Sequence, residues 1–563
     1  MGSEIKCLVI SDSVADNFAA LLRNDENLPR LNVTTAPYDQ VRQVLLDEDA
    51  ECWQSKKDVA VVWTRPQAVI PSFRDLSEGR EVSVPKTLEE VDEYCDALKL
   101  AAGRARALLV PTWSIPDVRA FSLLDMTTGI GTGNMIMRMN LRLAENLEKE
   151  PGIHVLSSGA WITRAGPDAF SDKLWYMAKV PFSNEVYKAA VVDIKSALRA
   201  IAGDSRKLIL LDLDDTLWGG IVGDVGWENV VLGGHDHIGE AYRDFQLGLK
   251  AFAARGILLG IVSKNEETVA LEAIEKHPEM VLRREDFAGW RINWRDKAEN
   301  IVELVKELNL GLQSVVFIDD NPMERARVRE ALPEVLVPEW PTDRTQYRRA
   351  LLDLDCFNAV SIGVEDRQRT DMYRAETERR GVRKEVGSFE DWLKTLGVRV
   401  TVGHLSRANL ARVEQLLNKT NQMNLRTRRM TAEEIPNWAS GPGRVFLVFT
   451  VSDRFGDSGL TGILSLEEAD GSVNITDFVL SCRVMGRRVE EAMVHIAVEY
   501  ARRRKLSHVR ADFVPTARNK PCHDFWLKSG FEQGKTENLF TWSTERSYPA
   551  PDGVEIRQSD PVG

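Results

Sequence analysis

The stretch from Leu208 to Gly220, which reads LILLDLDDTLWGG, constrains the fold of this chain more than any other part of it. A run of apolar residues stands directly before Asp212, Asp214 and Thr216. A buried strand here would deliver two carboxylates and a hydroxyl at its carboxyl end. Because open α/β sheets carry their chemistry in the crevice at that end of the strands, the stretch predicts a polar site at one edge of a sheet.

The sequence around this stretch alternates between strand and helix signals from residue 207 to residue 341. Apolar runs predict strands at 207–213, 256–263, 314–319 and 335–340. Helical periodicity predicts helices at 238–254, 266–277, 296–308 and 322–332. Strands that alternate with helices of this length form βαβ units, so we expect a parallel sheet with right-handed crossovers.

Further polar residues follow these strands or open the helices. They are Ser263, Lys297 and the pair Asp319 and Asp320. Phosphoryl transfer needs a nucleophile, a proton donor, a cation and hydrogen-bond donors held in line, and this set can supply all of them. Two or three converging carboxylates favour Mg²⁺. Asp320 is either a further ligand or a residue that orients one.

In this order the motifs resemble those of the haloacid dehalogenase superfamily, and the resemblance covers residues 207–341. It implies a Rossmann-like core in which Asp212 is the nucleophile that forms an aspartyl-phosphate and Asp214 is the general acid and base. It implies a metal site made of Asp212, Asp214 and Asp319. It implies a phosphate-binding set made of Thr216, Ser263 and Lys297.

The segments between these motifs are short. Between Thr216 and Ser263 there is room for little more than a hairpin and one helix, and between Ser263 and Lys297 for one helix and a loop. We therefore expect a core without a cap domain. Such a site stays open, so either its substrate is large or another domain or protein closes it.

A second mixed α/β pattern begins near residue 397. A strand at 473–482, VNITDFVLSC, leads into RVMGRRVEEAMV and a helix over about 487–504. This arrangement resembles the GNAT acyltransferase fold, in which an R/Q-x-x-G-x-G/A loop wraps the pyrophosphate of coenzyme A. Arg488 stands at the third specified position of this pattern, where the fold has glycine or alanine. An arginine at this position suits the binding of a single phosphate, such as that of a phosphopantetheine arm. The residues assigned to this arm are Arg483, Gly486, Arg487 and Arg488.

Cys482 ends the predicted strand beside Arg483, Arg487 and Arg488, at the predicted N-terminus of a helix. Positive charge and the helix dipole both favour the thiolate, which is the form that attacks acyl groups. The alternative is a buried, unreactive cysteine. His495 and His523 are candidate bases, and either could equally be structural.

Taken together, LDLDDTLWGGIVGD, SKN at 263–265, FIDDNPMER and SCRVMGRRVE resemble the FkbH-like proteins of polyketide biosynthesis. The resemblance implies transfer of the D-glyceryl unit of 1,3-bisphosphoglycerate, with dephosphorylation, onto the thiol of an acyl carrier protein. Cys482 would carry the acyl group and the Mg²⁺-dependent centre at Asp212 would remove the phosphomonoester. The first alternative is a plain phosphatase of a metabolite or phosphoprotein with a binding-only C-terminal domain. The second is a non-catalytic scaffold for carrier proteins.

The N-terminal part resembles the SGNH-hydrolase-like domain that precedes the phosphatase part in this family. Residues 5–10 and 59–64 predict strands, and Ser11 is either a nucleophile or an ordinary serine at a helix entry. The sequence PFSNE stands where the resemblance implies a turn with the catalytic histidine, and it contains no histidine. We therefore expect this part to support the rest of the chain or to recruit a partner, and not to catalyse a reaction. The expected domains are 1–204 (SGNH-like), 205–345 (phosphatase), 346–396 (helical connector) and 397–563 (GNAT-like).

Composition narrows the partners and the compartment. The chain has 85 Asp plus Glu and 73 Lys plus Arg, which gives a net charge of −12. It therefore lacks the overall positive charge that is typical of proteins that bind nucleic acid. The six cysteines form no CxxC pair, which indicates a reducing compartment. No apolar run reaches the roughly 20 residues that cross a bilayer, and the N-terminus lacks a signal-peptide pattern. We expect a cytoplasmic protein that binds neither nucleic acid nor membrane.

Overall fold

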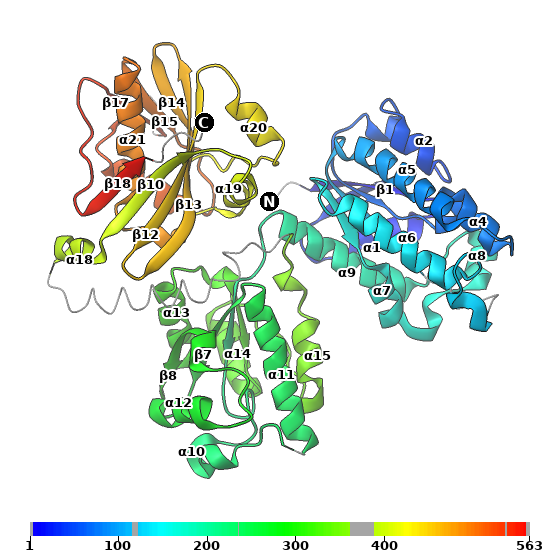
Figure 1. Cartoon of the computed structure of the whole chain (residues 1–563). Helices are drawn as coiled ribbons and strands as arrows, with labels where there is room; N and C mark the ends of the chain where they lie inside the picture. The colour runs from blue at the N-terminus through cyan, green and yellow to red at the C-terminus, as the bar shows by residue number, and fades with distance from the viewer. Residues whose placement is uncertain (1–3, 115–121, 235, 361–387, 535–537, 559–563) are drawn as a thin grey trace. The chain divides into compact units, whose positions relative to one another are not determined.

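The computed structural model describes residues 4–114, 122–234, 236–360, 388–534 and 538–558. The chain divides into two compact units, Met1–Arg199 and Ala200–Gly563 (Figure 1). The first unit carries one sheet, and the second carries two. Mixed α/β architecture with parallel sheets is therefore confirmed.

The first unit contains a five-stranded parallel sheet in the order β2-β1-β3-β4-β5. Its strands are β1 (Ile5–Ile10), β2 (Leu31–Thr35), β3 (Lys57–Val62), β4 (Ala105–Pro111) and β5 (Ile153–Leu156). Its helices are α1 (Asp16–Asn24), α2 (Val41–Leu46), α3 (Pro66–Val69), α4 (Pro71–Ser77), α5 (Val84–Ala102), α6 (Thr132–Leu147), α7 (Ser158–Ala165), α8 (Asp172–Ala178) and α9 (Asn184–Ile201). The strands predicted at 5–10 and 59–64 correspond to β1 and β3.

The central part of the second unit contains a four-stranded parallel sheet in the order β8-β7-β6-β9. Its strands are β6 (Leu208–Leu211), β7 (Leu258–Ser263), β8 (Phe287–Ile292) and β9 (Val315–Ile318). Its helices are α10 (Val222–Val225), α11 (His237–Ala254), α12 (Glu267–Lys276), α13 (Lys297–Glu307), α14 (Pro322–Ala331) and α15 (Tyr347–Leu352). The four helices predicted between the strands agree with α11 to α14.

Strand β6 is buried on both faces, which explains its unbroken apolar sequence. Ile209 and Leu211 pack into one core cluster, and Leu208 and Leu210 pack into another on the opposite face. Because successive side chains of a strand point to opposite faces, a strand with helices on both sides needs apolar residues at every position. This burial holds the residues that follow β6 in a fixed place.

Two features of this sheet differ from the prediction. Strand β8, FAGWRI, was not predicted, because Gly289 and Arg291 interrupt its apolar pattern and it lies at the sheet edge. The strand predicted at 335–340 does not form. Leu336 makes only an isolated bridge with Val316, and Pro338 and Pro341 cannot donate ladder hydrogen bonds.

The predicted connector at 346–396 is packed against the two cores at its two ends. Tyr347, Leu351 and Phe357 belong to the apolar cluster of the central sheet. At the other end, helix α18 (Phe389–Leu396) buries Trp392 and Leu393 in the core of the C-terminal part. Both ends of the predicted helical connector therefore carry apolar residues that belong to a core. Residues 361–387 of it lie outside the described residues.

The C-terminal part contains a nine-stranded mixed sheet in the order β16-β17-β15-β14-β13-β12-β10-β18, with β11 paired to β14. Its strands are β10 (Val398–His404), β11 (Met423–Asn424), β12 (Arg444–Asp453), β13 (Gly456–Ala469), β14 (Ser472–Leu480), β15 (His508–Asp512), β16 (Glu532–Gln533), β17 (Leu539–Ser543) and β18 (Val554–Gln558). Its further helices are α19 (Leu410–Lys419), α20 (Glu434–Ala439), α21 (Val489–Arg503) and α22 (Lys520–Lys528).

Strands β14 and β15 diverge after a short parallel ladder, and the chain itself fills the gap between them. The ladder joins 473–475 to 509–511. Beyond it, β11 pairs with the end of β14, and the carbonyl of Leu425 accepts a hydrogen bond from the amide of Val514 at 3.0 Å. An extended ligand therefore has no free backbone edge between these two strands.

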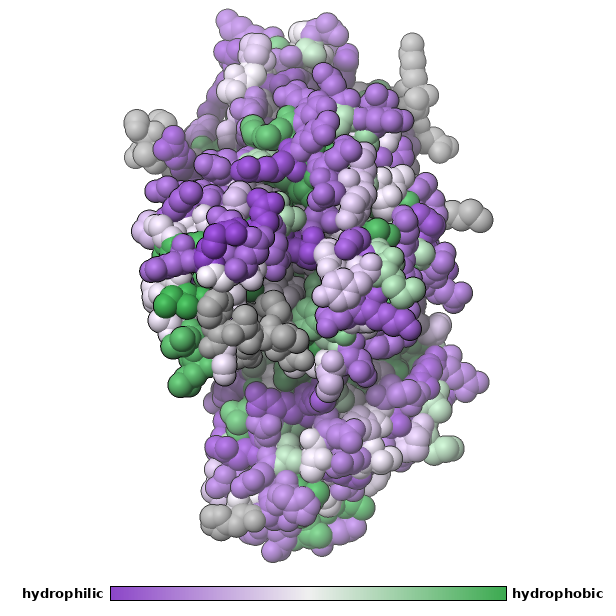
Figure 2. All heavy atoms as spheres, turned by 90° about the vertical axis from the view of Figure 1, so that its right-hand side faces the viewer, coloured by the Kyte–Doolittle hydropathy of each residue, from purple (hydrophilic) through white to green (hydrophobic). Residues whose placement is uncertain are grey.

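The face of the molecule drawn in Figure 2 is mainly hydrophilic. Figure 2 shows one face of the molecule, on which apolar residues gather only in small separate patches. Among the described residues, every helix is too short or too polar to cross a membrane.

The packing of α18 can be tested with Leu393→Ala. Because Leu393 is fully buried, truncation should destabilise the C-terminal part by about 2–5 kcal/mol. Lys394→Ala on the exposed side of the same helix should change stability by no more than about 0.5 kcal/mol. Urea unfolding followed by tryptophan fluorescence measures both, and equal effects would contradict the packing described.

Candidate active site at the carboxyl edge of the central sheet

The chain turns sharply after β6 and presents Asp212 and Asp214 at the carboxyl edge of the sheet. The backbone of Asp215 takes a φ of +55°, which L residues seldom adopt and which marks a tight turn. The carboxylate of Asp214 accepts hydrogen bonds from Trp218 Nε1 at 2.9 Å, the amide of Val222 at 3.1 Å and Asn265 Nδ2 at 2.8 Å. Donors from the central part of the second unit thus hydrogen-bond to both carboxylate oxygens of Asp214.

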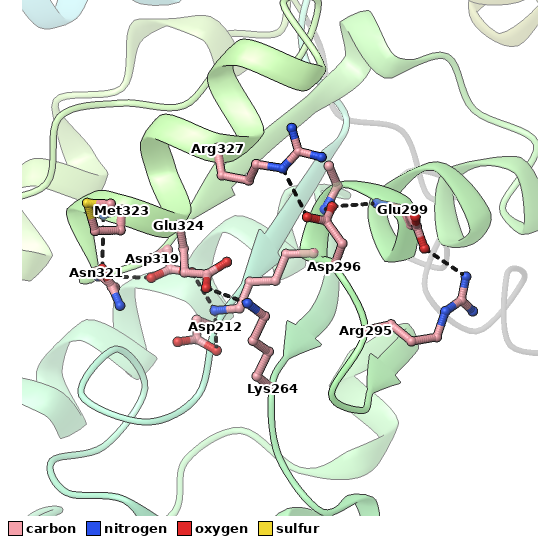
Figure 3. Close-up of polar contacts among 12 residues, drawn as sticks. Asp212, Lys264, Arg295, Asp296, Glu299, Asp319, Asn321, Met323, Glu324 and Arg327 are labelled. Atoms are coloured by element: carbon pink, nitrogen blue, oxygen red, sulfur yellow. Dashed lines mark hydrogen bonds and ion pairs between the residues drawn. The ribbon is translucent and has the colours of Figure 1, made fainter.

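Three carboxylates converge at this edge. Oxygen atoms of Asp212, Asp319 and Asp320 lie within 4.8 Å of one another, and Figure 3 shows Asp212 beside Asp319. The Nζ of Lys297, which is only 3% exposed, lies 3.1 Å from Asp212 Oδ1 and 2.6 Å from Asp319 Oδ2. These hard oxygen donors suit a divalent cation such as Mg²⁺.

Burial and mutual repulsion perturb these groups. Burial, together with the nearby Asp212, raises the pKa of Asp319 to about 6. Burial by itself would lower the pKa of Lys297, but Asp212 and Asp319 outweigh it and raise that pKa above its usual range. The three carboxylates outnumber the buried ammonium and the guanidinium of Arg344 beside Asp320, so the site keeps a negative charge that favours a cation.

Asp214 and Asp320 are placed differently from the predicted metal set. The carboxylate of Asp214 lies outside the converging group, because Trp218, Val222 and Asn265 hold it, whereas Asp320 lies inside the group. Burial raises the pKa of Asp214, which favours the protonated form that an acid needs. The converging carboxylates are therefore those of Asp212, Asp319 and Asp320, and the carboxylate of Asp214, predicted as a metal ligand, is not among them.

The predicted phosphate-binding residues lie at the same edge. Thr216 is buried, and its hydroxyl lies 3.3 Å from Asp320 Oδ1 and accepts a hydrogen bond from the amide of Asp320 at 3.0 Å. Ser263 is the last residue of β7, and Lys297 is the first residue of α13. Thr216 therefore also positions Asp320, a role that the sequence did not indicate.

Residues outside the motifs, one of them beyond the predicted domain, hold the motif loop in place. Tyr242 and Tyr347 each donate a hydrogen bond to the carbonyl of Asp215 at 3.2 Å. Arg344 donates to the hydroxyl of Tyr242, and its Nη2 lies 3.8 Å from Asp320 Oδ2. No sequence signal identified these three residues, because their roles depend on the chain folding back after β9.

The rim of this edge is open. The segment between β6 and β7 forms only α10, a single 3₁₀ turn and α11, apart from residue 235, which is not described. Trp294 after β8 is 73% exposed and Met323 after β9 is 76% exposed. Lys264 pairs with Glu324 at 2.6 Å beside them (Figure 3). The described residues thus agree with the expected absence of a cap over this site.

Cys482 lies elsewhere in the second unit. Strand β14 ends at Leu480, Cys482 opens a 3₁₀ turn that ends at Val484, and α21 begins only at Val489. The predicted position at a helix N-terminus is therefore wrong, because the intervening loop separates the thiol from α21. Cys482 is half-buried, and its carbonyl accepts a hydrogen bond from Asn309 Nδ2 at 3.0 Å.

The four residues assigned to a phosphopantetheine arm divide into two kinds. Arg487 is 2% exposed and pairs with the buried Asp453 at 3.0 Å, while Arg488 pairs with Glu390 at 3.4 Å. A buried carboxylate thus holds Arg487, so the geometry does not offer this arginine to a phosphate, whereas the partner of Arg488 is an exposed carboxylate. Gly486 takes a φ of +76°, and Arg483 lines a pocket together with Cys482.

The first unit has no comparable site at its predicted serine. Ser11 and Ser13 lie with their hydroxyl oxygens 2.9 Å apart, and the adjacent cavity measures about 10 Å³. Asp12 is buried and pairs with Arg65 at 2.8 Å. A cavity of this size holds about one water molecule, so it offers no room for a substrate.

No protein-family model and no curated protein sequence matches the chain. Among solved structures, the chain is similar to the N-terminal part of the protein BF1531 from Bacteroides fragilis, which contains a phosphatase domain complexed with Mg. The two share 27% identity with a TM-score of 0.58, over 64% of this chain and 95% of that one.

Acetyltransferase structures match a smaller part of the chain. The ribosomal-protein-S18-alanine N-acetyltransferase of Escherichia coli is 8% identical over 26% of this chain and 94% of its own, with a TM-score of 0.21. A GNAT-family acetyltransferase of Staphylococcus aureus is 9% identical over 26% of this chain and 99% of its own, with a TM-score of 0.21. The GNAT-like character of the C-terminal part stays a prediction.

Removing the buried cation tests the charge balance of the site. Lys297→Met leaves the carboxylates uncompensated, so the central part should lose about 3–5 kcal/mol of stability. Added Mg²⁺ should restore much of this loss, because it replaces the missing positive charge. Thermal unfolding with Mg²⁺ and with EDTA measures both effects.

Lys306→Met provides the matched control on the exposed face of the same helix. It should leave the unfolding temperature and its response to Mg²⁺ unchanged. If Lys297→Met were equally harmless, the described ion pairs would have no energetic role.

The cysteines should differ widely in reactivity. Burial raises the pKa of Cys7 and Cys522 to about 12 and that of Cys95 to about 11. At mildly alkaline pH these three thiols should therefore react with iodoacetamide at least about 10²-fold more slowly than Cys482, which is half-buried. Peptide mass spectrometry of the native protein measures the rates, and fast labelling of Cys522 would contradict the described core.

Proposed function

We propose that this chain is a Mg²⁺-dependent phosphatase joined to an acyl-transfer centre. It would load the D-glyceryl unit of 1,3-bisphosphoglycerate onto the phosphopantetheine thiol of an acyl carrier protein. The observation that carries the phosphatase part is the convergence of Asp212, Asp319, Asp320 and Lys297 at one sheet edge. The likeness to a phosphatase-domain structure that holds Mg supports it.

In the phosphatase reaction, Asp212 attacks the phosphorus atom of the monoester. A bond forms between a carboxylate oxygen and phosphorus, and the bond from phosphorus to the alcohol oxygen breaks. Asp214 lies two residues further on, with a raised pKa, and gives its proton to the leaving alcohol. The same carboxyl group then takes a proton from the water that hydrolyses the aspartyl-phosphate.

Lys297 holds Asp212 in place and neutralises phosphoryl oxygens as charge builds up in the transition state. A bound Mg²⁺ would supply further charge neutralisation, with Asp212, Asp319 and Asp320 as its carboxylate ligands. Ser263 at the end of β7 would donate a hydrogen bond to a phosphoryl oxygen.

In the acyl-transfer reaction, the Cys482 thiolate attacks the carbonyl carbon of the acyl phosphate. A sulfur–carbon bond forms, the bond from the carbonyl carbon to the phosphate oxygen breaks, and inorganic phosphate leaves. Thioester exchange with the carrier thiol then returns Cys482 to its free form. This half of the proposal depends on the FkbH-like motifs and on the accessibility of Cys482 in a pocket.

Intact-mass measurement after incubation with 1,3-bisphosphoglycerate tests both halves. We expect a glyceryl or phosphoglyceryl adduct that is absent in Cys482→Ala. In Asp212→Asn, release of phosphate from the monoester should fall by about three orders of magnitude or more, because the nucleophile is lost.

The outcomes separate the alternatives. Phosphate release without any adduct would leave a plain phosphatase whose C-terminal part only binds. Unchanged phosphate release in Asp212→Asn would argue against the assigned nucleophile and for a scaffold. Asp224→Asn, an exposed carboxylate close to the same loop, is the matched control and should behave like the original chain.

A further inference from the structure

Cys482 lines a pocket of about 450 Å³ in the second unit. Helix α19 contributes one wall, the start of α22 another, and the loops that precede the strands of the central sheet a third. This volume lies within the range of small-molecule sites, which is roughly 300–1,000 Å³. The thiol therefore has room beside it for a ligand larger than an acyl group.

The walls of this pocket are strongly basic. Six cationic side chains line it against a single carboxylate, that of Asp204. The cationic residues are Lys207, Arg412, Lys419, Arg483, Arg518 and Lys520. Because the whole chain carries a net charge of −12, this concentration of positive charge is local and favours an anionic ligand.

The pocket lies at the opposite end of the central sheet from the carboxylates. Lys207 precedes β6, Leu258 opens β7 and Ser314 precedes β9, and all three line the pocket. Asp212 stands at the other end of β6, five residues after Lys207 or roughly 16 Å along an extended strand. The thiol pocket is therefore a separate site, and its basic residues are not those of the phosphatase centre.

We infer that this pocket binds the phosphate group of the molecule that gives acyl groups to Cys482 or takes them from it. Arg518 and Lys520, which line the pocket, act as phosphate-binding residues in place of Arg487 and Arg488, which do not line it. A bound phosphate would replace the exposed ion pairs of Arg518 with Asp204 and of Lys520 with Asp524. Two sources share this chemistry, a phosphorylated three-carbon acid and a phosphopantetheine arm. The inference rests on the proposed acyl transfer and names the site that recognises its ligand.

Protection of Cys482 from iodoacetamide tests the inference on the full chain, because this neutral reagent does not itself need the positive charge. Each probe has a phosphate-free partner: 3-phosphoglycerate with glycerate, and S-methyl phosphopantetheine with S-methyl pantetheine. We expect at least one phosphorylated probe to slow labelling of Cys482 at least threefold more than its partner. The pair that does so identifies the source of the phosphate.

The variant Arg518→Gln/Lys520→Gln should abolish this protection. The control Arg502→Gln/Arg503→Gln removes the same number of charges from the exposed end of α21. It breaks the exposed ion pair of Arg502 with Glu499, whereas the test pair breaks those of Arg518 with Asp204 and of Lys520 with Asp524. The control should keep the protection. Unchanged labelling of Cys52 and Cys356 shows in each case that the variant is folded.

Two results would overturn the inference: no phosphate-dependent protection by either probe, or equal loss of protection in the two double variants. The inference and the proposed function can fail separately. An acyl adduct without phosphate-dependent protection would refute the site alone. Protection without any adduct would refute the acyl transfer and leave a phosphate-binding pocket.

Discussion

The ion pairs of Lys297 with Asp212 and Asp319 are the contacts on which the candidate active site depends. They join the ends of three elements, because Asp212 follows β6, Asp319 follows β9 and Lys297 opens α13. The register of β6 and β9 sets Leu211 beside Ile318, which brings the next residue of each strand together. A slip of one residue would turn the apolar side chains of β6 to the wrong face, so the packing on both faces fixes the carboxylates as well.

The sequence predicted the parts of the fold in which local pattern and burial agree. Strands β6, β7 and β9 are continuous apolar runs because both of their faces are covered, and α11 to α14 show helical periodicity. Strand β8 escaped prediction because an edge strand tolerates Gly289 and Arg291. The range 335–340 is apolar because Val335 and Val337 pack into the core beside β9, while its backbone pairs with β9 only at Leu336.

For the candidate site, the sequence identified residues but not all of their partners. Asp212 and Asp319 follow predicted strands and Lys297 opens a predicted helix. Because the carboxyl ends of parallel strands share one edge of the sheet, these positions predicted that the three side chains would lie together. Which carboxylate faces a metal was not predictable, because Trp218 and its neighbours decide the orientation of Asp214. Arg487 lies in a loop whose sequence pattern is typical of phosphate binding, but it pairs with a buried carboxylate that is far away in the sequence. The sequence pattern could not predict this contact, because it depends on how the chain folds.

The residues that follow the central sheet determine how far an isolated fragment of this part must extend to keep its fold. Tyr347 holds the motif turn through the carbonyl of Asp215, and Phe357 packs on Phe252 of α11 in the same core. A fragment that stopped at residue 345 would keep every motif residue and Tyr242, but it would lose the hydrogen bond of Tyr347 to the motif turn and the core residues that follow it. The smallest fragment that keeps the complete core of this part therefore extends to about Phe357. A different C-terminal domain could be joined to the core only after that residue.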